Sequence, residues 1–96
     1  MRGQLAISRS GHDKGRIYVI LKEEADSVYL ADGKIRFPEK PKKKNKKHIQ
    51  VIRKLPEHIT ELLPQNREFR NEEIKRAIKL YQKASNEEVS ACQKQM

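Results

Sequence analysis

The sequence predicts a small α+β protein in which a β-barrel or half-open roll of about five strands precedes C-terminal helices. Up to residue 54, short apolar or alternating runs are separated by glycine-containing turns, a pattern typical of strands. From residue 55 onward, apolar residues recur at helical spacing. The 96 residues suffice for one compact core. We therefore expect a β domain over residues 1–54 and a helical extension over residues 55–96.

The first two strands flank a polar turn. Residues 4–9 alternate, with Leu5 and Ile7 on one face, and residues 10–15 form a turn bracketed by Gly11 and Gly15. The run from Ile17 to Leu21 is apolar without interruption. Such a run between turn signals predicts a strand that is buried on both faces.

The next two strands are predicted as a hairpin. Asp32-Gly33, flanked by alternating apolar residues, is typical of a type I′ turn. That register places Leu30 opposite Ile35, and Val28 opposite Phe37. Residues 48–52 form the fifth predicted strand, with Ile49 and Val51 on the same side. For the tyrosines at positions 18 and 29 we expect core packing rather than stacking on RNA bases.

The helical extension begins with a short helix from Pro56 to Leu63, which Pro64 stops. Asn71 is suited to cap a longer helix, with two glutamates favourable in its first turn. Ser85-x-x-Glu88 resembles a capping box for a last short helix that carries Val89 and Cys92. The longer helix has one apolar stripe, which could cover the strand of residues 17–21: Ile74, Ala77, Ile78, Tyr81 and Ala84.

The excess charge lies in one segment. The chain has a net charge of +9, and the segment from Lys34 to Lys54 alone carries ten basic residues and one acid, Glu39. A strongly basic balance favours a polyanionic partner such as nucleic acid. An anionic membrane is the weaker alternative, because the lysine run has no apolar face.

The centre of that segment, PEKPKKKNKKH at residues 38–48, is predicted as a lysine-rich loop with both ends held by strands. Runs of like charge are often solvated linkers or disordered tails, and a nuclear-localisation signal is another alternative. We favour a tethered arm that binds RNA phosphates, since lysine is a mobile point charge that binds phosphate without reading bases.

The sequence carries no sign of enzymatic chemistry. Cys92 is the only cysteine, and His12, His48 and His58 lack ligand spacing. No pairing of nucleophile and base and no phosphate-binding glycine loop is present, so we expect neither an enzyme nor a bound metal or cofactor. With one cysteine, no signal segment and no stretch that could span a bilayer, we expect a cytoplasmic protein.

Residues 4–21 resemble a KOW motif. Gly11, Asp13, Lys14, Gly15 and Arg16 match its turn, and Ile20 matches its recurrent aliphatic residue. Tyr18 departs from many bacterial ribosomal KOW domains, which have a second glycine there. With the Asp-Gly turn and the lysine run, roughly residues 2–52 are similar to short bacterial relatives of the archaeal and eukaryotic large-subunit ribosomal proteins of the fourteen-e type.

The resemblance implies an SH3-like barrel that binds structured RNA without catalysis, with ribosomal RNA as the expected ligand. It implies that Gly11 and Gly15 shape the turn, and that Lys14 and Arg16 face RNA. The helical extension would cover the barrel or dock a partner such as a ribosomal protein. The alternatives are a protein-interaction module of the transcription or translation machinery and a non-specific DNA binder. The full set of predicted RNA-binding residues is Lys14, Arg16, Arg36, Lys40, Lys42, Lys43, Lys44, Lys46 and Lys47.

Overall fold

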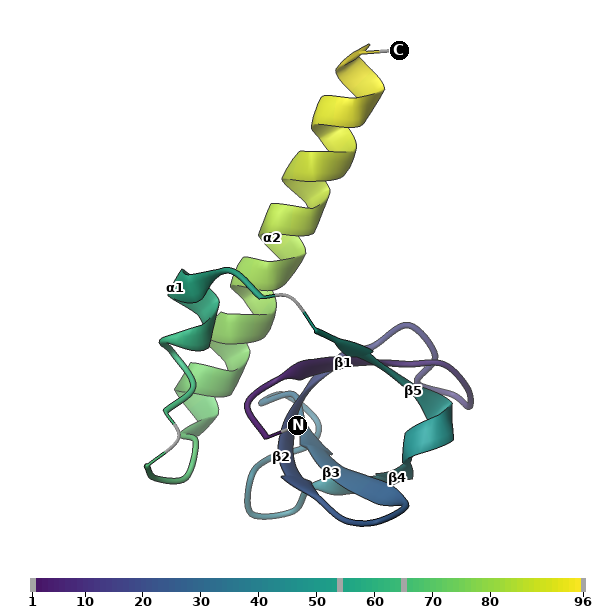
Figure 1. Ribbon diagram of the computed structural model, residues 1–96, viewed down its shortest axis with the longest axis vertical. Helices are drawn as coiled ribbons and strands as arrows, with labels where there is room; N and C mark the ends of the chain where they lie inside the picture. The colour runs from purple at the N-terminus through teal and green to yellow at the C-terminus, as the bar shows by residue number, and fades with distance from the viewer. Residues whose placement is uncertain (1, 54, 65, 96) are drawn as a thin grey trace.

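The computed structural model describes residues 2–53, 55–64 and 66–95, with side chains as far as Ala84. A curled antiparallel sheet carries the helices on one side (Figure 1), which makes the protein a small α+β fold. Its elements are β1 (Leu5–Ser8), β2 (Ile17–Glu23), β3 (Ser27–Ala31), β4 (Lys42–Asn45), the 3₁₀ turn η1 (Lys46–His48), β5 (Ile49–Ile52), α1 (Glu57–Thr60) and α2 (Asn71–Gln95).

The five strands lie in the order β4-β3-β2-β1-β5, and every neighbouring pair is antiparallel. The two edge strands, β4 and β5, follow one another in the chain and are joined by η1. They do not pair with each other, so the sheet is not closed into a barrel. Of the two predicted architectures, the half-open roll describes this sheet (Figure 1).

The predicted Asp32-Gly33 hairpin is wrong. β3 pairs with β2 on one side, and on the other side its partner is β4, whose register sets Leu30 opposite Lys42 and Val28 opposite Lys44. Asp32 instead closes a compact loop, because its Oδ1 accepts the backbone N–H groups of residues 34, 35 and 36 at 2.9–3.0 Å. Those N–H groups are therefore not free to bond to a partner strand, because the aspartate side chain already accepts them.

The predicted lysine-rich loop is therefore largely regular structure. Of residues 38–48, Lys42–Asn45 form β4 and Lys46–His48 form η1. The run is not an arm between two strands, because it supplies the edge strand itself and continues directly into β5.

β2 is buried on both faces, as the sequence predicts. Tyr18, Val19 and Ile20 are all at most 2% exposed. Val19 packs toward the helices, whereas Tyr18 and Ile20 face the inside of the roll. The inner core is completed by Ala6, Val28, Leu30 and Ile49, with Val51 packed against it.

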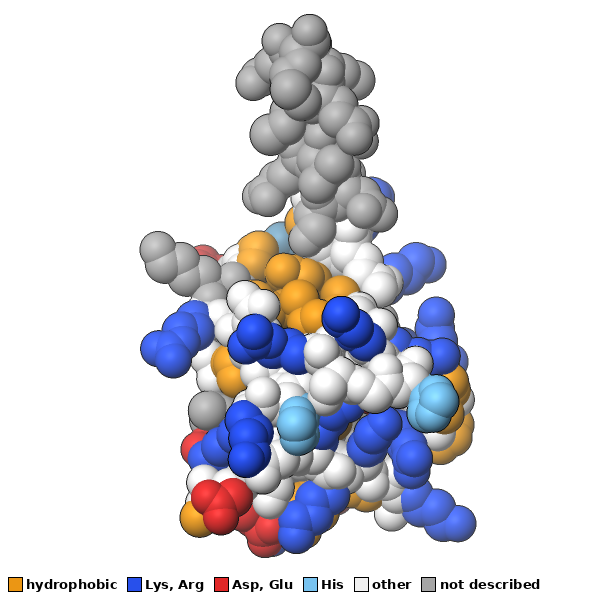
Figure 2. Space-filling view, turned by 90° about the vertical axis from the view of Figure 1, so that its right-hand side faces the viewer, with side chains coloured by type: hydrophobic (Ala, Val, Ile, Leu, Met, Phe, Trp, Pro, Cys, Tyr) orange, Lys and Arg blue, Asp and Glu red, His pale blue; other side chains and the backbone are white. Residues whose placement is uncertain are grey.

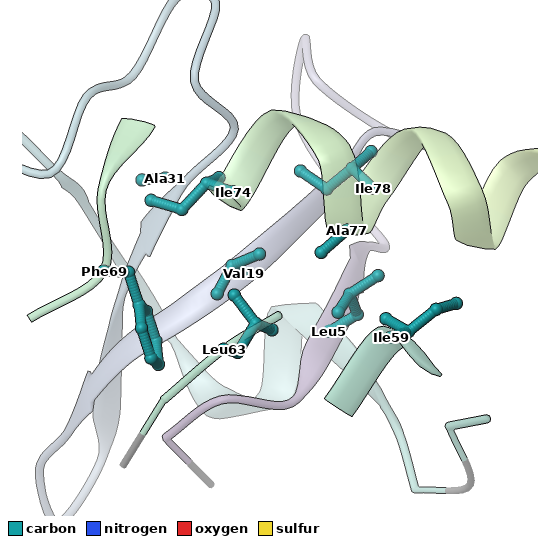
Figure 3. Packing of buried hydrophobic residues seen from close by; sticks show 9 residues of the cluster. All are labelled: Leu5, Val19, Ala31, Ile59, Leu63, Phe69, Ile74, Ala77 and Ile78. Carbon is teal, nitrogen blue, oxygen red and sulfur yellow. The ribbon is translucent and has the colours of Figure 1, made fainter. Parts of the chain in front are cut away.

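The outer core joins the sheet to the helices. Figure 3 shows Ile74, Ala77 and Ile78 of α2 facing Leu5 and Val19. Leu63 and Ile59 close the lower side of this core, and Phe69 closes one end. The predicted apolar stripe and its target strand are thus confirmed for the buried part of α2, while Tyr81 is only partly buried against this core.

The helix boundaries differ from the predicted ones. α1 has four residues rather than extending to Leu63, and α2 continues through Ser85 without a separate last helix. The side chains of the predicted capping box, Val89 and Cys92 lie outside the described residues. Asn71 does not act as the cap: the backbone N–H of Arg70 donates to Glu73 Oε1 at 2.8 Å, which is one half of a capping box.

Candidate nucleic-acid interface

A buried carboxylate, Asp13, lies at the centre of the β1–β2 turn. Its Oδ1 accepts hydrogen bonds from Ser8 Oγ at 2.9 Å and Lys44 Nζ at 2.7 Å. Its Oδ2 accepts from Tyr18 Oη at 2.8 Å and Lys42 Nζ at 2.9 Å. Each oxygen therefore has two donors. We call these five residues, Ser8, Asp13, Tyr18, Lys42 and Lys44, the Asp13 cluster.

The electrostatics of the Asp13 cluster favour the ionised carboxylate. Burial by itself raises the pKa of Asp13, but the hydrogen bonds from Lys42 and Lys44 lower it more, assisted by Tyr18 and Ser8. The pKa of this carboxyl is therefore held well below its usual range. The pKa of Tyr18 is raised by burial and by its bond to the Asp13 carboxylate, so its hydroxyl stays protonated and donates.

The Asp13 cluster turns two of the predicted RNA-binding lysines inward. The Lys44 side chain is 10% exposed, and its ammonium also donates to Ser8 Oγ at 2.6 Å and the Ser10 carbonyl at 2.9 Å. An ammonium has three protons, so Lys44 has no donor left for a phosphate. The Lys42 side chain is 29% exposed, and Lys46 forms an ion pair with Glu23 at 2.6 Å.

The remaining predicted residues are exposed. Lys43 alternates with its inward neighbours on β4 and is within 3.6 Å of Glu24. Arg16 lies 3.8 Å from Asp32, with half of its side chain exposed. We call the six exposed residues the outer cations: Lys14, Arg16, Arg36, Lys40, Lys43 and Lys47.

The β1–β2 turn lies between the other segments that carry outer cations. The Arg9 N–H donates to the His48 carbonyl at 2.8 Å, which places the turn beside η1. The Arg16–Asp32 contact places its other end beside the β3–β4 loop. Figure 2 shows Lys and Arg side chains over much of one face of the molecule, with most of the visible acidic side chains at its lower left.

The shape of the turn depends on its two glycines. Gly11 and Gly15 have φ of +85° and +90°, which side chains rarely adopt. Backbone bonds from Gly15 N to Ser8 O and from Ser8 N to Arg16 O, at 2.8 and 2.9 Å, tie the turn to the strands. The turn is therefore a rigid support for the exposed Lys14 and Arg16.

Two expectations about apolar residues on this surface are wrong, namely the core packing of Tyr29 and the burial of Ile35 and Phe37 on an apolar hairpin face. Tyr29 is only partly buried and stands opposite Lys43 on the outer face. The ammonium groups of Lys22 and Lys43 lie 5.8 Å from its ring centroid. In the β3–β4 loop, Ile35 and Phe37 are 59% and 41% exposed.

The turn motif includes Asp13, but it does not indicate that this carboxylate holds two lysines. One signal is present in the sequence. Lys42-Lys-Lys-Asn45 follows Pro41 and precedes the predicted strand of residues 48–52, and alternate lysines of such a segment can pair with one acid from a neighbouring turn. Nothing in the linear sequence shows that Asp13 and Lys44 meet, because 31 residues separate them.

Among the described residues, no group of three or more histidine, cysteine, aspartate or glutamate side chains is arranged to hold a metal ion. In the part of the chain that the structure describes, no helix is both long enough and apolar enough to cross a membrane.

The chain matches no protein-family model, and none of the curated proteins with which it was compared matches it.

Proposed function

We propose that this protein binds structured RNA, most simply ribosomal RNA, through the outer cations, and that it acts without catalysis as a cytoplasmic, ribosome-associated protein. The observation that carries the proposal is that the lysines of the run fall into two groups. Lys42 and Lys44 form ion pairs with Asp13. Lys43, Lys47 and the cations of the turn and the β3–β4 loop are exposed.

The curled five-stranded sheet with a glycine-shaped turn supports the likeness to KOW domains of the SH3-like type. In this proposal the sheet supplies rigidity, and the turn supplies a shaped tip. Affinity comes mainly from phosphate neutralisation. Choice of site comes from RNA shape, because the base edges of helical RNA are poorly accessible to side chains.

The proposal is tested by measuring binding of a structured RNA, a single-stranded RNA and a duplex DNA over a salt series. If the six outer cations each meet a phosphate, the slope of log K against log salt is about −4 to −5. We expect tightest binding to the structured RNA. Equal affinity for all three polyanions would make the protein a non-specific binder of nucleic acid and contradict recognition of shape.

A charge-reversing variant tests the surface itself. Lys43→Glu/Lys47→Glu removes two outer cations from β4 and η1, so we expect at least tenfold weaker RNA binding and a salt slope reduced by roughly 1.5. The matched control is Arg53→Glu/Arg70→Glu, which changes the net charge equally at exposed positions outside the outer cations.

Equal loss in both variants would mean that only net charge matters. Circular dichroism checks that both are folded. Co-sedimentation of the endogenous protein with ribosomal subunits at low and high salt then tests whether the RNA is ribosomal.

A further inference from the structure

A groove runs between α2 and the sheet on the side of Arg16. One wall consists of residues 15–17 with part of the β3–β4 loop, and the other wall is α2 from Glu72 to Lys83. Its volume is about 1220 Å³. The side chain of Asn71 fixes the two walls at one end, since its Nδ2 donates to the Gly33 carbonyl at 3.1 Å.

The groove is strongly cationic. Among the residues whose side chains the structure describes, two acids line it, Asp32 and Glu72. The Asp32 carboxylate already accepts three backbone hydrogen bonds and faces Arg16. Six exposed basic residues line the groove: Arg16, Lys34, Lys75, Arg76, Lys79 and Lys83.

Counting charges along the sequence does not reveal this cationic groove. Outside residues 34–54 the basic and acidic residues of the chain balance. Within α2, however, residues 74–84 contain four cations and no acid. Arg76, Lys79 and Lys83 recur at intervals of three and four residues, which places them on one face of the helix. The acids that balance them in the sequence lie before and after this segment.

We propose that this groove is a second phosphate-binding surface, so that one RNA is held both by the outer cations and by α2. Arg16 belongs to both surfaces, and the neighbouring Lys14 continues the first, so a single RNA backbone can pass from one to the other around the turn. The inference rests on the proposed RNA-binding function and adds α2 to its site.

A nucleic-acid backbone fits the groove better than an acidic protein segment does. The basic side chains are long, exposed and follow the helix axis, the arrangement that neutralises consecutive phosphates without base recognition. Four apolar residues also line the groove, Ile17, Ile35, Ile78 and Leu80. Of these only Ile35 is exposed, and it lies on the loop rather than on the cationic helix face.

The test uses the full chain and a structured RNA in a salt series, with Lys79→Gln/Lys83→Gln as the groove variant. Removing two phosphate contacts should reduce the salt slope by roughly 1.5 and weaken binding about tenfold. The control is Arg53→Gln/Arg70→Gln, which removes the same charge at exposed positions that do not line the groove. It should leave the slope nearly unchanged.

The outcomes separate the inference from the function on which it rests. If the wild-type protein binds no RNA, both are overturned. If it binds RNA and the groove variant keeps the wild-type slope, only the second surface is overturned. An unchanged RNA slope, with weaker binding of a short peptide of alternating leucine and glutamate, would overturn the inference in favour of an acidic protein partner.

Discussion

Asp13 accepts hydrogen bonds from Lys42 and Lys44, which follow it by 29 and 31 residues. Two ammonium groups on the inner side of a sheet are costly unless a charge opposes them. The carboxylate provides that charge, and Tyr18 and Ser8 complete its coordination. At the scale of single residues, this pairing determines which lysines are structural and which are left for a ligand.

The pH dependence of stability tests this role. Because the folded-state pKa of Asp13 is lowered, its contribution to stability is fully present above about pH 5, roughly one unit above the unfolded pKa of about 3.9, and is lost progressively as the pH falls below that. We expect Asp13→Asn to lower the free energy of unfolding by about 3 kcal/mol at neutral pH, and to flatten the acid limb of the profile.

Urea denaturation between pH 2 and pH 7 measures both effects. Asp26→Asn, at an exposed position, serves as the control and should change stability by less than about 0.5 kcal/mol. A profile for Asp13→Asn that is parallel to the wild-type profile would contradict the role assigned to this carboxylate.

At the scale of elements, β4 is a strand made of residues that disfavour strands. Its stability comes from alternation: Lys42 and Lys44 stand opposite Leu30 and Val28 on the inner face, while Lys43 stands opposite Tyr29 on the outer face. Charged residues on an edge strand also discourage pairing with another sheet. One short strand thus combines an inner structural face with an outer face available to a ligand.

The alternation predicts opposite outcomes for two neighbouring substitutions. Lys44→Met removes a buried ammonium from Asp13 and should cost about 3 kcal/mol of stability. Lys43→Met, at an exposed position, should change stability by less than about 0.5 kcal/mol and reduce the RNA salt slope by roughly 1.

The free energy of unfolding and the RNA salt slope are measured for both variants and compared. Equal destabilisation by both variants would show that the strand does not distinguish its faces.

At the scale of the whole molecule, the β3–β4 loop joins the sheet to α2. Gly33 has a φ of +77°, and a Cβ there would lie against Lys75 and 3.2 Å from the Asn71 carbonyl oxygen. The loop can approach the helix this closely only because residue 33 has no side chain. The close approach also sets the position of Lys34 and Ile35 in the wall of the groove.

A pair of glycine substitutions measures this docking. Gly15→Ala and Gly33→Ala both force alanine into a positive φ, which costs on the order of 1–2 kcal/mol. A Cβ at Gly15 meets no atom within 4 Å, so Gly33→Ala should cost at least about 1 kcal/mol more. Thermal or urea unfolding gives the difference, and equal costs would mean that the loop and helix have room to separate.

Local patterns in the sequence predict much of the fold. The apolar run of β2 indicates burial on both faces, because such a strand needs a layer on each side. The stripe on α2 indicates the helix that covers one of them. The positions of β1, β2, β3 and β5 follow from turn signals and alternation. Six of the nine cations predicted to bind RNA are exposed, and their role in binding stays a prediction.

The failures have a common cause. Asp32-Gly33 predicts a hairpin from four neighbouring residues, but the Asp32 carboxylate satisfies the N–H groups that the second strand would need. The lysine run predicts a loop, because runs of like charge are often solvated linkers or tails. The groove on α2 was missed because charges that cancel along the chain need not cancel on a surface.

The sequence by itself determined the α+β class, the two-faced strand β2, the apolar stripe of α2 and the concentration of charge at residues 34–54. Only the tertiary structure decided which segment pairs with β3, which lysines face Asp13, and that α2 forms a cationic groove with the loop. Periodicity and turn residues act over a few neighbours and can be read locally. The pairing of a buried charge with its counter-charge depends on residues that meet only after folding.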